Sequence, residues 1–166
     1  MDPVTVSVLI DAPRERVFDY LQDIANRPEF TDHFLVHWRL TRVDPVGAGA
    51  GARFRMKRRG PARRFAWGDV TLAEVLPSYR IVEIGRAGKG NRVRTIGVYE
   101  LTDGPDGTTH VEYTMQTEPH ILTDRIVEAL GQRGWVKRGY GKALRRLRSI
   151  LEVGERRGER ATVAGG

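Results

Sequence analysis

The close spacing of strand-like segments between residues 35 and 118 constrains the fold more than any other feature of the sequence. Segments that alternate apolar and polar residues are separated there by short turns rich in Gly, Pro, Asn and Asp. These connections are too short to hold a crossover helix, so neighbouring strands are expected to pair antiparallel. The pattern therefore predicts a meander of six strands. Its turns are predicted at residues 47–51, 60–61, 77–78, 88–91 and 103–107.

Other periodic segments flank this meander. Residues 4–10 carry apolar side chains at every second position, which predicts a strand. Residues 13–24 repeat apolar residues at helical spacing, and residues 29–33 are predicted to form a second short helical turn. Residues 135–153 carry an apolar stripe with a period of three to four residues, which is typical of a long amphipathic helix.

Length and composition indicate one globular domain. The chain has 166 residues, of which 40% are hydrophobic and 30% are charged, as in ordinary globular proteins. We predict a single ligand-binding domain over residues 1–153 and a disordered tail over residues 154–166. The sequence has no apolar run long enough to span a bilayer, no export signal and no cysteine. These features favour a soluble protein in the cytoplasm.

The order of these elements and three local segments resemble a known superfamily. Residues 8–23 read as an apolar strand that leads through Ala-Pro into a helix with a hydrophobic-aromatic pair and a late Asp. Residues 46–54 resemble a glycine-rich hairpin, and residues 144–152 resemble a terminal helix. The chain is thus similar to the SRPBCC superfamily of polyketide cyclases, dehydrases and START-like lipid-transfer proteins. The resemblance implies an α+β helix-grip fold. In that fold a seven-stranded curved antiparallel sheet surrounds a long C-terminal helix, and two short helices follow the first strand.

A curved sheet of this size leaves space that a single helix cannot fill, which predicts an internal cavity. Aromatic and methionine side chains would form apolar, adaptable walls, and tyrosine hydroxyls would orient a ligand. The alternative is that these side chains only pack the core. The predicted ligand-binding residues are Trp38, Phe54, Met56, Phe65, Trp67, Val82, Ile84, Tyr99, Tyr113, Met115, Trp135 and Tyr140.

The predicted function is that of a binding or carrier protein for a small hydrophobic or amphipathic ligand, such as a polyketide, a lipid or an isoprenoid-like compound. An alternative is a polyketide cyclase or aromatase that uses the same cavity and positions a flexible chain for reaction. The sequence holds no nucleophile elbow, triad or telling carboxylate pair, so no catalytic residue is assigned. The candidates for acid and base chemistry are Tyr99, Tyr113, His37, Asp69 and Glu83.

Basic residues give a third hypothesis. The formal net charge is +7, and basic residues cluster at residues 53–64 and 133–148. The first cluster alternates with apolar residues at its start, which places its charges on the convex face of the sheet. A solvated face is the simpler interpretation, and contact with an anionic membrane or RNA is the functional one. No specific DNA partner is predicted, and the oligomeric state is left open.

Two motifs suggest other ligands. Residues 47–52 match the dinucleotide-binding pattern G-x-G-x-x-A, but the residues that follow alternate as a strand and offer no helix N-terminus to a pyrophosphate. His33 and His37 are four residues apart, yet His37 is predicted to lie on a strand, and no third ligand is near in sequence. We therefore predict neither a cofactor nor a metal ion.

Overall fold

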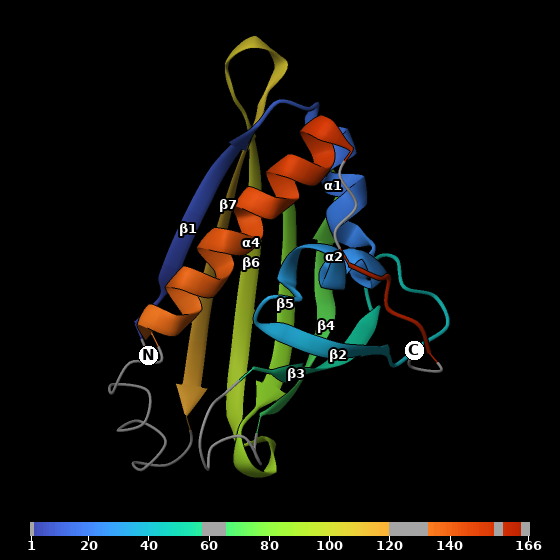
Figure 1. Ribbon diagram of the computed structural model, residues 1–166, viewed down its shortest axis with the longest axis vertical. Coiled ribbons are helices and arrows are strands. Elements are labelled where there is room, and N and C mark those ends of the chain that lie inside the picture. The colour runs from blue at the N-terminus through green and yellow to red at the C-terminus, as the bar shows by residue number, and fades with distance from the viewer. Residues whose placement is uncertain (1, 58–65, 120–132, 155–157, 164–166) are drawn as a thin grey trace.

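The chain forms one curved antiparallel sheet with a long helix across its concave side (Figure 1). This computed structural model describes residues 2–57, 66–119, 133–154 and 158–163. The helical segments are α1 (Arg14–Gln22), η1 (Ile24–Asn26), α2 (Arg27–Thr31), η3 (Lys89–Asn91), η4 (Pro105–Gly107) and α4 (Arg133–Val153). The strands are β1 (Val4–Ile10), β2 (Leu35–Leu40), β3 (Gly51–Met56), β4 (Trp67–Leu76), β5 (Arg80–Ala87), β6 (Val93–Asp103) and β7 (Thr109–Pro119).

The sheet has the order β1-β7-β6-β5-β4-β3-β2, and every neighbouring pair is antiparallel. Strands β2 to β7 therefore form the meander that the turn spacing predicts. The first strand pairs with the last, and α1, η1 and α2 make the connection from β1 to β2. The predicted helix-grip fold is confirmed.

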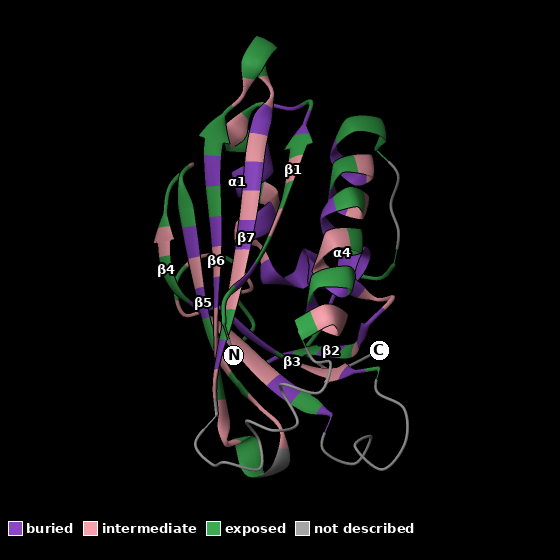
Figure 2. Ribbon diagram, turned by 90° about the vertical axis from the view of Figure 1, so that its left-hand side faces the viewer, coloured by how far each residue is buried: buried purple, intermediate pink, exposed green. Residues whose placement is uncertain are grey.

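Helix α4 packs against β1 and α2. Its apolar stripe faces inward, where Val136, Leu144, Leu147 and Leu151 are buried, as the buried colour on its inner side shows (Figure 2). Gly139 lies on the same stripe, and a Cβ there would be 2.7 Å from the ring of Phe34. The missing side chain lets the helix approach that ring. None of the described helices has the length and hydropathy that a membrane span requires.

The described part of the C-terminal segment, residues 158–163, lies along the edge strand β2. The amide of Ala161 donates to the carbonyl of Ala25 at 2.9 Å, and the amide of Leu40 donates to the carbonyl of Thr162 at 3.0 Å. Ala161 is buried, and Arg39 forms a parallel bridge with Thr162. For these residues the structure differs from the disordered tail predicted from the sequence, because exposed edge groups of β2 supply partners for this short segment.

Candidate functional site

A buried ion pair lies on the concave side of the sheet. Arg27 of α2 donates from Nε and Nη2 to Oε1 of Glu83 on β5, at 3.1 and 2.5 Å. The two side chains are 3% and 9% exposed. Glu83 points inward because it shares the alternation of Ile81, which is fully buried. A carboxylate in this position needs a cation, and Arg27 supplies it.

Three tyrosines stack beside this ion pair. Tyr99 on β6 and Tyr113 on β7 are cross-strand partners, and their ring centroids are 4.3 Å apart. The ring of Tyr140 on α4 lies 4.4 Å from that of Tyr113. The guanidinium carbon of Arg27 lies 4.9 Å from the centroid of the Tyr99 ring, a cation–π distance. We call Arg27, Glu83 and these three tyrosines the inner polar cluster.

Burial fixes the protonation of this cluster. Burial raises the pKa of Tyr99 and of Tyr113 well above the ordinary value, and burial together with the charge of Glu83 raises the pKa of Tyr140 to about 12. For Arg27, burial lowers the pKa, but the charge and hydrogen bond of Glu83 together with the neighbouring tyrosines outweigh this effect, and the net direction is upward. At neutral pH the cluster therefore holds protonated phenols and a guanidinium cation, all of which are hydrogen-bond donors.

Part of this donor capacity is unused. The Nη1 atom of Arg27 is buried and has no hydrogen-bond partner among the described residues. The side-chain contact between Tyr113 and Tyr140 contributes to the raised pKa of Tyr113 and opposes the rise in the pKa of Tyr140. A buried donor without a partner costs free energy, so an acceptor brought into this region would be stabilised there.

The cluster lies between two unlike halves of the concave face. Toward the end of β6 the inward residues of the sheet are large and fully buried, as at Leu72 and Ile81. Toward the start of β6 the inward positions hold small residues of partial exposure, such as Gly85, Ala87 and Thr95. Inward residues of a closed core would be buried, so solvent reaches this half of the concave face at these three positions, whereas Thr117 opposite Thr95 is buried.

A glycine also makes room at the cluster itself. Gly97 on β6 is the cross-strand partner of Glu83, and a Cβ there would lie 2.5 Å from the Tyr113 hydroxyl oxygen. The phenol of Tyr113 therefore occupies space that any other residue at this position would fill.

Of the predicted acid and base candidates, the structure brings together Tyr99, Tyr113 and Glu83. His37 and Asp69 are not part of this cluster. His37 is exposed on a bulge of β2, with a φ of 54°. Asp69 is on the outward face of β4, where its Oδ1 accepts a hydrogen bond from the amide of Arg86 at 2.8 Å.

Three of the predicted ligand-binding residues do not point inward. Trp67 and Ile84 are 41% and 39% exposed, and Val82 shares the outward face with Ile84. The predicted inward placement of all three is wrong. On β5 both faces carry apolar residues, so alternation alone did not choose the face of Val82 and Ile84. On β4, Trp67 shares the outward face of Asp69. Phe65 lies outside the described residues. The others point inward or pack against the core: Trp38, Phe54, Met56, Tyr99, Tyr113, Met115, Trp135 and Tyr140.

Arg27 is the residue of the inner polar cluster that was not predicted from the sequence. Because Arg27 follows the first predicted helix and precedes a proline, the sequence predicted only that it marks the end of that helix. The signal was Glu83, which lies between Ile81 and Gly85 on one strand face. An acidic side chain at an inward position is costly to bury unless a cation pairs with it, and that cation is expected from another helix or strand.

The structure also places the residues of the two other motifs. His33 donates from Nε2 to the carbonyl of Gly139 at 3.0 Å and accepts at Nδ1 from Arg146 at 3.1 Å. Both ring nitrogens are therefore engaged in contacts with α4. In the glycine-rich segment, Gly47 and Gly49 have φ of +77° and +84°, and strand β3 begins at Gly51. The segment is a turn that leads into a strand.

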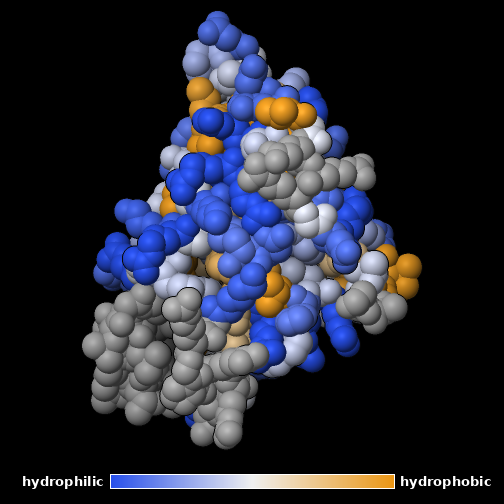
Figure 3. Space-filling model, viewed as in Figure 1, coloured by the Kyte–Doolittle hydropathy of each residue, from blue (hydrophilic) through white to orange (hydrophobic). Residues whose placement is uncertain are grey.

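The described basic residues of the two predicted clusters lie mainly on outer surfaces, and residues 58–64 of the first cluster lie outside the described residues. Arg53 and Lys57 are exposed on or next to β3, as the alternation predicts. On α4 the basic side chains point away from the sheet, and Figure 3 shows hydrophilic atoms over this face. Arg146 differs from Arg133 and Arg148 because its side chain is largely buried, where it pairs with Asp32 and contacts His33.

A family model described as polyketide cyclase / dehydrase and lipid transport matches residues 1–152. The chain belongs to this family. No curated protein matches the sequence. A hypothetical protein, jhp0584, from Helicobacter pylori superposes with a TM-score of 0.71 at 11% identity, over 91% of this chain and 88% of that one. TTHA0849 from Thermus thermophilus gives 0.66 at 15% identity, over 90% and 96% of the two chains.

A third similar structure is DynU16, described as a putative protein in the dynemicin biosynthetic locus. It superposes with a TM-score of 0.62 at 18% identity, over 98% of this chain and 51% of that one. At these identities the structural likeness supports the fold of the polyketide cyclase/dehydrase family and no particular ligand.

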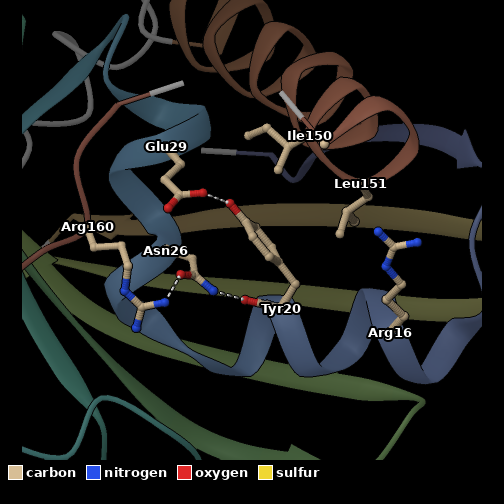
Figure 4. A pocket seen from close by; sticks show the side chains of 8 residues that line it. Arg16, Tyr20, Asn26, Glu29, Ile150, Leu151 and Arg160 are labelled. Atoms are coloured by element: carbon tan, nitrogen blue, oxygen red, sulfur yellow. Dashed lines mark hydrogen bonds between the residues drawn. The ribbon is translucent and has the colours of Figure 1, made fainter. Parts of the chain in front are cut away.

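A pocket also lies apart from the inner polar cluster. A pocket of about 380 Å³ is formed where α1, η1, α2, the end of α4 and the C-terminal segment meet (Figure 4). Its lining residues are Arg16, Tyr20, Asn26, Glu29, Ile150, Leu151, Gly154 and Arg160.

Proposed function

We propose that this protein binds a small amphipathic molecule, such as a polyketide or a lipid, on the accessible half of the concave sheet face, with an oxygen-bearing group of the ligand at the inner polar cluster. Membership of the polyketide cyclase/dehydrase and lipid transport family supports a hydrophobic ligand or a polyketide-related role. The observation that carries the proposal is the buried Nη1 of Arg27, which has no partner among the described residues.

The chemistry of the site supports a ligand of this class. The small inward residues Gly85, Ala87 and Thr95 leave room for an apolar body beside the sheet, and Phe54 and Met115 offer it apolar contacts. A keto, carboxylate or hydroxyl oxygen at the inner end would accept from Arg27. Such a pairing would use a donor that is already buried, so the ligand would supply the missing acceptor at little desolvation cost to the protein.

A polyketide cyclase or dehydrase activity is a second candidate, and the protonated state of the cluster favours it. Because the pKa of Tyr99 and that of Tyr113 are raised, these phenols are poor bases at neutral pH but remain hydrogen-bond donors. Together with Arg27 they would polarise a ketone and stabilise the enolate that forms when a neighbouring carbon loses a proton. The base for that proton is not assigned.

Fatty-acid binding tests the carrier proposal. We expect palmitate to bind the purified chain in isothermal titration calorimetry, and hexadecane-like probes without an oxygen to bind at least about tenfold more weakly. Replacing Ala87 by Trp would fill the accessible half of the concave face and abolish binding. Arg86→Trp is the matched control, because Arg86 is the exposed neighbour on the outward face.

Two results would overturn the carrier proposal. One is that palmitate fails to bind the wild-type chain, and the other is that it binds the Ala87→Trp variant as well as the Arg86→Trp variant. For the enzyme candidate, a poly-β-keto thioester is the substrate to test. Tyr99→Phe is expected to lower kcat with little change in KM, and the absence of turnover in the wild-type chain would remove that candidate.

Contact of the basic surface with RNA or an anionic membrane, and a cytoplasmic location, remain predictions from the sequence. Vesicle and RNA binding that weakens with salt would support the first of these.

A further inference from the structure

The pocket between α1, α2 and α4 carries its own pattern of charges and is separate from the inner polar cluster. Glu29 of α2 forms one end of it, and Arg16 of α1 forms the other (Figure 4). The side chain of Tyr20 lies between them, and Ile150 and Leu151 of α4 cover the opposite side. The pocket is thus polar at both ends and apolar in the middle.

The carboxylate at one end has one hydrogen-bond donor among the described residues. Glu29 is 5% exposed, and the hydroxyl of Tyr20 donates to its Oε2 at 2.5 Å. Within the described residues this is the only hydrogen bond of the carboxylate, and no cation forms an ion pair with it. A carboxylate has about four lone-pair sites, so a buried one with a single donor is expected to attract a cation or further donors.

The other arginine that lines the pocket is already engaged. Arg160 of the C-terminal segment donates to Oδ1 of Asn26 at 2.7 Å and to Oδ2 of Asp23 at 2.6 Å. Asn26 in turn donates to the carbonyl of Tyr20 at 3.0 Å. These contacts hold the wall of the pocket in place and, among the described residues, leave Glu29 without a charge partner.

The guanidinium at the other end belongs to Arg16 of α1. Arg16 is exposed, and among the described residues it makes no hydrogen bond and no ion pair. Its side chain extends toward Leu151 (Figure 4). Between the two charges, Ile150 and Leu151 are 6% and 4% exposed, so the middle of the pocket has a well-packed apolar wall.

We propose that this pocket binds a small zwitterion whose ammonium and anionic groups are separated by a short aliphatic chain. The ammonium group pairs with Glu29, the anionic group pairs with Arg16, and the chain lies between the ring of Tyr20 and the wall formed by Ile150 and Leu151. A volume of about 380 Å³ is within the range of small-molecule sites.

The test uses three probes of similar length on the full chain. ε-Aminocaproate carries both charges, n-hexylamine carries only the ammonium group, and caproate carries only the carboxylate. In amide-detected NMR titrations, ε-aminocaproate is expected to shift the signals of Tyr20, Glu29 and Leu151 and to bind at least about tenfold more tightly than either single-charge probe.

Two variants assign the charges. Glu29→Gln and Arg16→Gln are each expected to weaken ε-aminocaproate binding about tenfold. Arg145→Gln, an exposed change on α4 outside the pocket, is expected to leave it unchanged. Arg16 is exposed, so its variant reports on binding even if Glu29→Gln disturbs folding.

Three results would overturn the proposal. They are no signal shift with ε-aminocaproate at about 50 mM, equal binding of the single-charge probes, and unchanged binding in Arg16→Gln. Because the inner polar cluster contains neither variant residue, failure here leaves palmitate binding unaffected, and failure of palmitate binding leaves this pocket unaffected.

Discussion

Replacing Glu83 by Gln would leave the guanidinium of Arg27 charged and without its counterion in the interior. The variant keeps the size of the side chain and one acceptor oxygen, so the change is mainly electrostatic. In the wild-type chain both Nε and Nη2 of Arg27 donate to the carboxylate, and the arginine side chain is 3% exposed. Little water is available to replace the lost charge.

The expected loss follows from this burial. Removing one partner of a buried ion pair costs about 3–5 kcal/mol, because the remaining charge is uncompensated. The amide of Gln still accepts a hydrogen bond, so we expect about 3 kcal/mol for Glu83→Gln. For a chain of this size, a loss of about 3 kcal/mol lowers the melting temperature by about 6–12 °C.

Urea unfolding followed by circular dichroism measures this free energy. The control is Glu118→Gln, which removes the carboxylate of a surface pair. Nη1 of Arg94 lies 3.6 Å from Oε2 of Glu118, and the two side chains are 54% and 44% exposed. The expected loss in the free energy of unfolding is therefore about 0–1 kcal/mol. The double variant Arg27→Met with Glu83→Leu removes both charges and is expected to lose less stability than Glu83→Gln alone.

The reasoning is refuted if Glu83→Gln and Glu118→Gln lose the same stability. The second contradicting result is a double variant that loses as much stability as Glu83→Gln or more, since the uncompensated charge would then not be the cause of the loss.

Two further predictions concern α4 and the helix beside it. Gly139→Ala is expected to destabilise the chain by about 1–3 kcal/mol because its Cβ would meet the ring of Phe34 at 2.7 Å. In Gly141→Ala the nearest atom is 3.9 Å away, so a gain of up to about 1 kcal/mol is expected by urea unfolding, and the opposite order would contradict the packing of α4. Burial of the ring, and then the charge of Arg146, lowers the pKa of His33. As the pH falls below about 6.5, the unfolded chain gains a proton at His33 that the folded chain does not, so the free energy of unfolding decreases. His33→Gln should lose this part of the pH dependence, and an unchanged difference between the two proteins from about pH 7.5 to 5.5 would contradict the account.

The architecture could be predicted because it depends on local patterns that repeat along the chain. Short turns between residues 35 and 118 forced an antiparallel meander, and the stripe on residues 135–153 defined the terminal helix. Both features follow from connection length and periodicity, which a single sequence displays.

The candidate site was only partly predictable because it depends on which face of each strand points inward. Tyr99 and Tyr113 are on the inward face of neighbouring strands, and their aromatic character agreed with that placement. On β5 apolar residues occur on both faces, so Val82 and Ile84 were predicted to point inward although Glu83 on the opposite face is the inward residue. The contact with Arg27, 56 residues earlier, reverses this choice, and no local pattern contains it.

The pocket at Glu29 shows a different limit. Its walls come from α1, α2, α4 and the C-terminal segment, and each contributes one or two side chains. No single segment carries a motif for it, and the segment that supplies Arg160 read as a tail without structure.

Intermolecular nuclear Overhauser effects from ¹³C-labelled palmitate test the central claim most directly, because they report which face of the sheet the ligand touches. The account predicts cross-peaks from the acyl chain to the methyl group of Ala87 and to the ring of Tyr99. Cross-peaks confined to outward residues such as Ile84 would contradict the proposed binding face. So would the absence of any cross-peak when the protein is saturated with palmitate.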